Sequence, residues 1–286
     1  SSHFGSSFGP PGKLTDMCSK RLLHLVAPLV LCCVAALVQW YSTQAAVLAP
    51  PRKITRLQPS TTPAQVAAVL QRDGVVIIER LATEETIAAS MAELRRDRAK
   101  DGNIRFGDNS ALWRRPLDAE TEATTKKLAN EPLVVEAAEL VRQVHGPGSD
   151  HCISWELRLL VISPGFEAGP LHRDVVDASK VPLERPMQWG LNAIWAVDNY
   201  TVENGATRFV VGSHTSAAPQ GHWDADHPDV DDLAEAAVMP AGSVVVYYAS
   251  LLHASGASSA AAPRTGMNFN YCAVDAAGGR PASWGW

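Results

Sequence analysis

Residues 155–174 read WELRLLVISPGFEAGPLHRD, an apolar, strand-like run followed by a Pro-Gly turn and then by His172-Arg173-Asp174. Side chains of an extended chain alternate between two faces, so His172 and Asp174 are expected to point one way and Arg173 the other. A strand and a turn just before this triplet place it at the mouth of a sheet. His172 and Asp174 therefore predict one part of a metal site.

A third ligand is expected from a distant strand. His253 ends the segment 243–253, which reads as a strand followed by a turn. Two imidazoles and one carboxylate on one side of a metal leave its other side open, which is the arrangement in non-haem Fe(II) oxygenases. Arg264 follows His253 after a short loop, and its planar guanidinium suits a dicarboxylate bound in the same cavity.

Simpler interpretations compete with the metal site. His172 and Asp174 could form a hydrogen-bonded surface pair, and His253 could be a histidine satisfied within the core. A second His-x-Asp triplet begins at His222, but it lies in the acid-rich stretch 221–232, which is more typical of a solvated loop than of a cation site. The two histidines, the aspartate, the arginine and the strand context together favour iron.

The order of the expected elements predicts the fold. The chain has 286 residues, of which 46% are hydrophobic, enough for one sizeable core and a single catalytic domain. Thr62 and Gln65 match the capping-box pattern, with Pro63 at the first helical position. Helices followed by many short strands predict the α+β class, with a double-stranded β-helix (jelly-roll, cupin-like) core and N-terminal flanking helices. Helices are expected over about 63–72, from 84 and from 132, and strands near 75–78, 153–162, 190–198, 207–211, 243–249 and 267–274.

The N-terminal segment predicts targeting. An apolar run, residues 22–38, follows Lys20 and Arg21 and precedes small residues, which is typical of a signal peptide or signal anchor at about 17–45 within a leader 1–50. The alternative is a buried helix of the fold. We expect entry to the secretory pathway, an endomembrane or a plastid reached through it, with membrane association through the apolar run, or the cytoplasm if the leader is not used. A linker over 51–61 and the catalytic domain over 62–286 are expected to follow.

Composition limits the classes of partner. The net charge is −5, and no cluster of lysine and arginine interleaved with aromatic residues occurs, so nucleic acid is not expected as a partner. Five cysteines are too few for a disulfide framework. A small molecule is therefore the expected partner, and the sequence makes no prediction of the oligomeric state.

Other polar and aromatic residues have a structural and a functional interpretation. His214 is interpreted as stabilising a turn rather than contacting substrate, and Trp155, Trp189 and Trp195 as core rather than pocket residues. Arg158 alternates with apolar neighbours in its strand and so could face the cavity.

An irregular stretch lies between the helix expected from 84 and the helix expected from 132. Residues 103–113 are polar, contain glycine and match no helix or strand pattern. Loops before a barrel can act as lids over the cavity. This stretch is therefore a candidate contact region for the substrate.

Five segments form a recognisable set: DGVVII (73–78), PLHRD (170–174), WAVDNYTVENGATRFVVGSH (195–214), MPAGSVVVYYASLLH (239–253) and PRTG (263–266). Together they resemble the phytanoyl-CoA dioxygenase family of Fe(II)/2-oxoglutarate oxygenases. The resemblance covers about residues 59–274, and the motif sequences are most similar to those of members that oxidise specialised metabolites in fungi and microbes.

The resemblance implies a ligand set and a co-substrate site. Members that oxidise metabolites often carry a glutamine just before the iron motif, where this chain has Pro170 and Leu171. Related halogenases lack the carboxylate ligand, so Asp174 favours oxygen insertion or desaturation. Carried over, the family pattern implies His172, Asp174 and His253 as ligands of Fe(II), Arg264 and Ser255 as partners of the distal carboxylate of 2-oxoglutarate, and Thr207 as a further contact with this co-substrate.

The predicted activity is that of a 2-oxoglutarate-dependent hydroxylase or desaturase that uses O2, acts on a small, lipophilic metabolite and releases succinate and CO2. Two other functions stay open from the sequence. One is a non-catalytic jelly-roll module that binds a ligand without turnover. The other is an oxygenase that modifies side chains of proteins, which requires an open groove.

Overall fold

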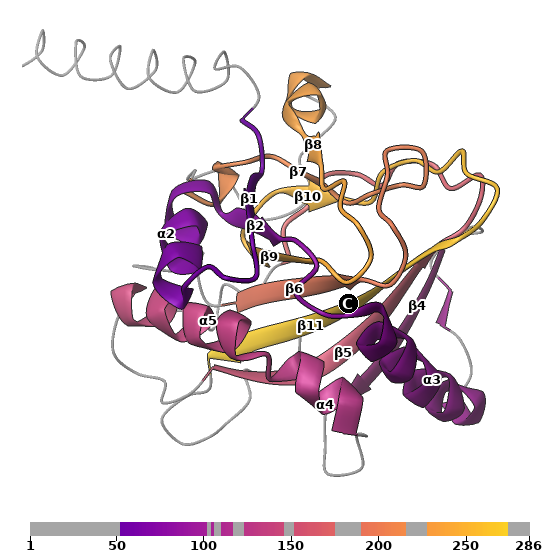
Figure 1. Cartoon of the computed structure of the whole chain (residues 1–286). Helices are drawn as coiled ribbons and strands as arrows, with labels where there is room; N and C mark the ends of the chain where they lie inside the picture. The colour runs from indigo at the N-terminus through magenta and orange to yellow at the C-terminus, as the bar shows by residue number, and fades with distance from the viewer. Residues whose placement is uncertain are drawn as a thin grey trace, which may run out of the picture. The chain divides into compact units, whose positions relative to one another are not determined.

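The computed structural model describes residues 52–101, 104–105, 110–116, 123–145, 152–174, 190–215 and 228–273. In this part of the chain the strands form two sheets (Figure 1). The larger contains β1 (Thr55–Leu57), β2 (Val75–Ile78), β3 (Ile104–Arg105), β4 (Ser110–Pro116), β5 (Cys152–Ile162), β6 (Gly190–Ala196), β9 (Val244–Tyr248) and β11 (Arg264–Ala273). The smaller contains β7 (Arg208–Phe209), β8 (Glu235–Ala236) and β10 (His253–Ala254).

Many neighbouring strands of the two sheets are not consecutive in the chain. The larger sheet has the order β1-β2-β9-β6-β11-β5-β4-β3, and the smaller has the order β10-β7-β8. All pairs are antiparallel except β1 with β2, which is parallel. The chain therefore crosses repeatedly between distant strands, which brings residues from 110 to 268 around one cavity.

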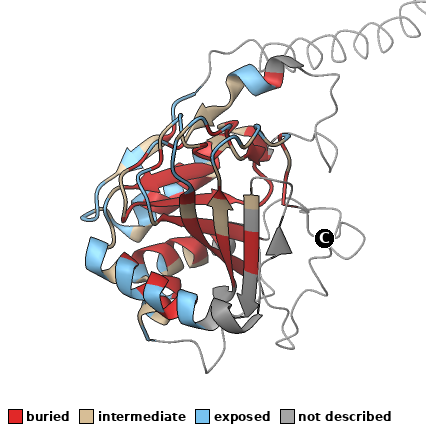
Figure 2. Ribbon diagram, turned by 90° about the vertical axis from the view of Figure 1, so that its right-hand side faces the viewer, coloured by how far each residue is buried: buried red, intermediate tan, exposed pale blue. Residues whose placement is uncertain are grey.

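Four α-helices lie in the described part of the chain: α2 (Pro63–Asp73), α3 (Glu84–Asp101), α4 (Ala123–Ala129) and α5 (Pro132–His145). Figure 1 shows α4 and α5 on one side of the larger sheet and the smaller sheet on the other. Every residue of β2, β6 and β9 is buried, because each strand is covered on both faces. Figure 2 shows these buried residues concentrated in the strands and on the inner sides of the helices.

The start of α2 confirms the expected cap. The Thr62 hydroxyl accepts a hydrogen bond from the Gln65 backbone N–H, while the Gln65 side chain accepts one from the Thr62 N–H at 2.9 Å. Pro63 lacks a donor, so it leaves no unsatisfied group at the first helical position. The helix ends at Gly74, whose φ of 78° lies in the left-handed region that glycine adopts without strain.

Gly74→Ala is expected to destabilise the fold by at least about 1 kcal/mol, because a side chain at positive φ is strained. An added Cβ would also overlap the His214 ring and would lie 2.7 Å from Leu251 Cδ1. The measurement is the midpoint of thermal unfolding, with the exposed helix residue Ala68 changed to Ser as a control. An unchanged midpoint would contradict the tight packing of Gly74 against these side chains.

The α+β class and the expected helices are confirmed, and the expected strands occur with ends shifted by a few residues. The helix α4 and the strand β8 were not expected, and parts of the expected linker and of the expected irregular stretch form strands. Thr55–Leu57, within the expected linker, is the edge strand β1 and pairs with β2. Ile104–Arg105 and Ser110–Pro116 are strands β3 and β4, so parts of both halves of the expected irregular stretch 103–113 belong to the sheet. None of these segments has a strong strand pattern of its own. Pairing with neighbouring strands of the sheet stabilises them as strands.

Two predictions from the sequence concern residues outside the described part of the chain. These are the leader at about 17–45, with its targeting and membrane roles, and the second triplet at His222, and they stay predictions. Among the described residues, no helix is long and apolar enough to cross a membrane.

Candidate metal centre and its pocket

Two segments far apart in the chain bring the three expected ligands together. His172 pairs with His253 through an isolated antiparallel bridge, in which each backbone N–H donates to the carbonyl of the other residue at 2.9 Å. The Asp174 N–H donates to the Ala249 carbonyl, at 2.8 Å. Backbone pairing thus places the two histidines side by side, with the aspartate next to them.

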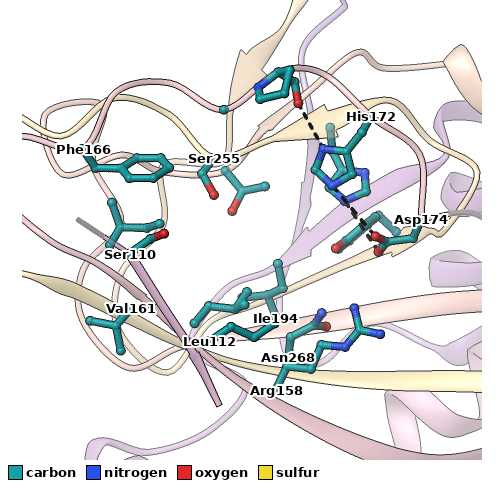
Figure 3. Close-up of a pocket in the computed structure, with 17 residues that line it drawn as sticks. Ser110, Leu112, Arg158, Val161, Phe166, His172, Asp174, Ile194, Ser255 and Asn268 are labelled. Atoms are coloured by element: carbon teal, nitrogen blue, oxygen red, sulfur yellow. Dashed lines mark hydrogen bonds and ion pairs between the residues drawn. The ribbon is translucent and has the colours of Figure 1, made fainter. Parts of the chain in front are cut away.

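The ligand atoms converge on one point (Figure 3). His172, Asp174 and His253 each offer one ligand atom, and these atoms all lie within 4.8 Å of one another. His172 Nε2 lies 3.9 Å from Asp174 Oδ1, and His253 Nε2 lies 3.6 Å from Asp174 Oδ2. These separations suit a small cation held between two nitrogens and one oxygen, which confirms that the predicted trio forms a cluster.

Both imidazoles are held with Nε2 directed at the cluster. His172 Nδ1 lies 3.0 Å from the Pro170 carbonyl, and His253 Nδ1 lies 2.8 Å from the Leu251 carbonyl. A carbonyl only accepts, so each Nδ1 carries the proton and each Nε2 keeps its lone pair. Burial lowers the pKa of His253 to about 4. At neutral pH this ring is therefore uncharged and able to bind a metal.

The Asp174 carboxylate is oriented by an amide network. Asn192 on β6 donates from Nδ2 to Asp174 Oδ2 at 2.7 Å, and Asn270 on β11 donates to Asn192 Oδ1. All three side chains are buried. Such support of a ligand fixes its direction and raises metal affinity.

Asn192→Ala is expected to weaken Fe(II) binding by about 10- to 100-fold, the usual effect of removing a group that orients a ligand. The apparent dissociation constant of Fe(II), measured anaerobically by competition with a chelator, checks this. Asn130→Ala is the matched control, because Asn130 is an exposed asparagine on α4's C-terminal turn. Equal constants for Asn192→Ala and the unmodified protein would contradict the role of the amide.

Arg173 points away from the cluster, as its position between the two ligands predicts. Its Nη1 donates to the Ser213 carbonyl at 2.9 Å and to the Ser250 carbonyl. Burial lowers the pKa of this guanidinium to about 10, so it stays charged at neutral pH. Arg173 therefore ties the ligand segment to the turn that precedes His253.

The three ligands line a cavity of about 290 Å³. This volume is near the lower end of the range for small-molecule sites. Apolar side chains dominate the wall, and polar residues of the larger sheet, Ser110, Arg158 and Asn268, also contribute to it. The apolar contributors are Leu112, Leu160, Val161, Ile162, Phe166, Pro170 and Ile194.

The residues expected to hold the co-substrate are placed at different depths. Thr207 and Ser255 line the cavity, whereas Arg264 is not among its lining residues. Arg264 is 1% exposed, and its guanidinium donates to the Tyr200 hydroxyl at 3.0 Å and to the Gly205 carbonyl. The guanidinium also lies over the Tyr200 ring, with Cζ 4.2 Å from the ring centre. The role of Arg264 in co-substrate binding stays a prediction.

Packing nevertheless places Arg264 near the end of the cavity that Thr207 and Ser255 form. Its partner Gly205 is close to Thr207 in the chain, and a Cβ on Gly205 would lie 2.6 Å from the carbonyl of Gly256, the residue after Ser255. In the larger sheet Arg264 pairs with Ile162, which lines the cavity. The Nε of Arg264 makes no hydrogen bond within the described part of the chain, so one donor is left for a ligand.

Other residues weighed from the sequence lie away from the cluster. His214 is buried, hydrogen-bonds the Gln71 carbonyl through Nε2 at 3.1 Å and stacks on Tyr248, which supports the structural interpretation. Trp195 is a core residue. The side chain of Trp155 and all of Trp189 lie outside the described residues.

Sequence reasoning did not identify the supporting asparagines. Asn192 lies in the otherwise apolar strand GLNAIWA, and Asn270 and Asn268 alternate with Phe269 on β11. A polar amide in a strand buried on both faces needs a partner. An asparagine within an apolar strand was therefore the sequence feature that could have indicated a supporting residue.

The chain is similar to known proteins over most of its length. The family model described as phytanoyl-CoA dioxygenase (PhyH) matches residues 70–266. "Dioxygenase trt7" of Aspergillus terreus is 29% identical over 227 residues, which cover 76% of each protein. "Fe(II)/2-oxoglutarate-dependent dioxygenase nvfF" of Aspergillus novofumigatus is 28% identical over 216 residues, which cover 70% of this chain and 68% of the relative.

Solved structures show the same fold. The non-haem α-ketoglutarate-dependent carbocyclase SnoK from nogalamycin biosynthesis matches with a TM-score of 0.58 and 20% identity, covering 75% of this chain and 87% of its own. The epimerase SnoN, in complex with Fe3+, α-ketoglutarate and nogalamycin RO, matches with a TM-score of 0.56 and 23% identity, covering 74% and 84%. These likenesses confirm the expected double-stranded β-helix core.

Proposed function

Because the chain belongs to the phytanoyl-CoA dioxygenase family and carries a His-Asp-His cluster suited to iron, we propose that it uses Fe(II), 2-oxoglutarate and O2 to hydroxylate or desaturate a small, lipophilic metabolite. The observation that carries the proposal is the cluster itself, whose three members all line the same cavity. These three residues would hold a metal at the wall of that cavity.

The substrate class rests on the cavity wall and on the relatives. Seven apolar side chains line the wall, so an apolar ligand body gains stability there by leaving water. The relatives are named as dioxygenases of fungi, and SnoN was solved with the small molecule nogalamycin RO. Both observations favour a metabolite over a protein side chain.

Each residue of the site has a role that its geometry suits. Fe(II) with 2-oxoglutarate and O2 supplies the oxidising chemistry when bound, and succinate and CO2 leave. His172, Asp174 and His253 hold the metal from one side. Arg264 and Ser255 would bind the distal carboxylate of 2-oxoglutarate, and Thr207 would be a further contact with this co-substrate. The apolar wall positions the substrate and excludes water.

Anaerobic titration of the protein with Fe(II) and then 2-oxoglutarate tests the proposal. The expected result is a weak visible charge-transfer band that saturates at one equivalent of each. Succinate release in the presence of O2 tests turnover. A folded protein that gives the band but releases no succinate with any of a broad panel of metabolites would favour the non-catalytic binding module, and a protein that gives no band would refute the proposal.

A further inference from the structure

One polar side chain of the cavity wall has no role in holding iron or 2-oxoglutarate. Asn268 lies within β11, opposite Arg158 on β5 and Ile194 on β6. Directly opposite residues of an antiparallel pair share a face, and all three residues line the cavity. Figure 3 shows Asn268 beside Arg158 and Ile194 on the sheet side of the cavity. The Asn268 side chain therefore faces the molecule that fills the cavity.

The carboxamide oxygen of Asn268 is buried without a hydrogen-bond donor. The residue is 3% exposed, and its Oδ1 makes no hydrogen bond within the described part of the chain. Such atoms are uncommon, because burying a polar group without a partner is unfavourable. Asparagine is also disfavoured in strands. This acceptor in the cavity wall therefore indicates a donor on a bound molecule.

The other polar residues of the wall already have partners or predicted roles. Ser110 and Arg158 each have an interaction within the protein, so neither is assigned to a ligand here. The Tyr247 hydroxyl interacts with the Asn192 side chain. The remaining polar lining residues are the three metal ligands and the two predicted contacts of 2-oxoglutarate. Among the described lining residues, Asn268 is the one whose acceptor is left for a substrate.

The co-substrate does not supply the donor. At neutral pH, 2-oxoglutarate carries two carboxylates and a keto oxygen, all of which only accept hydrogen bonds. Asn268 also lies four residues after Arg264 on β11, which is about 13 Å along an extended strand. The donor therefore belongs to another molecule in the cavity.

We propose that Asn268 accepts a hydrogen bond from a hydroxyl group of the primary substrate, so that the substrate is a lipophilic alcohol. The inference rests on the proposed function and names its substrate class. An apolar body that fills the cavity excludes water from Asn268, so a substrate without a donor leaves the oxygen unsatisfied and binds less tightly. A hydroxyl suits the mainly apolar wall better than an ammonium group, because burying a charge costs more than burying a neutral group.

Binding of matched alcohols and ethers tests this inference. The probes are octanol, decanol and 1-adamantanol, each beside its methyl ether, titrated calorimetrically into anaerobic protein loaded with Fe(II) and 2-oxoglutarate. At least one alcohol is expected to bind about fivefold or more tightly than its ether, because the ether accepts but cannot donate. 1-Adamantanamine, a cationic donor of the same shape, is expected to bind less tightly than 1-adamantanol. Ethers or the amine binding as tightly as the alcohols, or no alcohol that binds, would overturn the inference.

Variants of Asn268 assign the preference to its oxygen. Asn268→Leu removes the acceptor at similar size and is expected to abolish the preference for alcohols. Asn268→Thr, whose hydroxyl oxygen can accept, is expected to restore part of it. Ile194→Val is the matched control, because it changes the wall beside Asn268 without altering a polar group, and its ratio of alcohol to ether affinity is expected to stay the same. A full preference in folded Asn268→Leu would contradict the inference, and Asn268→Ala replaces this variant if it does not fold.

A second measurement separates a substrate contact from a contact with the metal or the co-substrate. Without alcohol, the visible band of Fe(II) and 2-oxoglutarate is expected to have the same position in Asn268→Leu as in the unmodified protein. A shifted band would instead assign Asn268 to a group on the metal, such as bound water, and would overturn the inference. Absence of the band from the unmodified protein would be a failure of the proposed function itself.

Discussion

Asp174→Ala is expected to lower 2-oxoglutarate turnover by at least about 100-fold, because loss of a direct ligand should exceed the 10- to 100-fold loss seen when only a supporting group is removed. The change deletes the one carboxylate among the three converging ligands and leaves a dication with two imidazoles and no negatively charged ligand. Succinate formation at saturating Fe(II) and 2-oxoglutarate measures the effect. The affinity for Fe(II) is expected to fall in parallel.

The matched control is Asp232→Ala, which removes an exposed aspartate. Its turnover and thermal midpoint are expected to equal those of the unmodified protein, since surface substitutions rarely change stability by more than about 0.5 kcal/mol. Full turnover in folded Asp174→Ala would show that the ligand set is wrong.

Arg264→Leu is expected to weaken 2-oxoglutarate binding by roughly 30-fold or more, because truncating one partner of a buried, hydrogen-bonded charge pair costs about 2–5 kcal/mol. The distal carboxylate would lose its guanidinium, while the iron ligands would stay in place. The visible band at increasing 2-oxoglutarate gives the dissociation constant directly. Fe(II) affinity without 2-oxoglutarate is expected to be unchanged.

Two further variants keep the Arg264 prediction interpretable. Arg264→Lys retains the charge but not the planar fork, so an intermediate loss is expected. Tyr200→Phe removes the hydroxyl that accepts from Arg264 Nη1 and tests whether Tyr200 positions the guanidinium. Unchanged 2-oxoglutarate affinity in folded Arg264→Leu would contradict the predicted role, and would be consistent with the position of Arg264 behind the cavity wall.

The ligand residues were predictable because their chemistry is local. His172 and Asp174 share a face in any extended chain, and few side chains other than imidazole and carboxylate bind iron in this arrangement. The capping box at Thr62 and Gln65 was predictable for the same reason, since both hydrogen bonds lie within one helical turn.

Other features depend on partners that no local pattern reveals. β1 and β4 take their structure from pairing with β2 and β5. Asn192 supports Asp174 only because β6 lies beside β9 and β11. Long-range pairing of this kind is set by the whole core, so intrinsic propensity gives a weak signal for it.

The sequence by itself determined which groups are available for chemistry: two imidazoles, a carboxylate and an arginine in a fixed order along the chain. The tertiary structure alone decided where they point. The bridge between His172 and His253 closes the ligand set, Tyr200 holds Arg264 behind the wall, and the pairing of β5 with β11 turns Arg158 and Asn268 into the cavity. The reason is physical, since side-chain identity is a local property, whereas direction and burial depend on which distant backbones share hydrogen bonds.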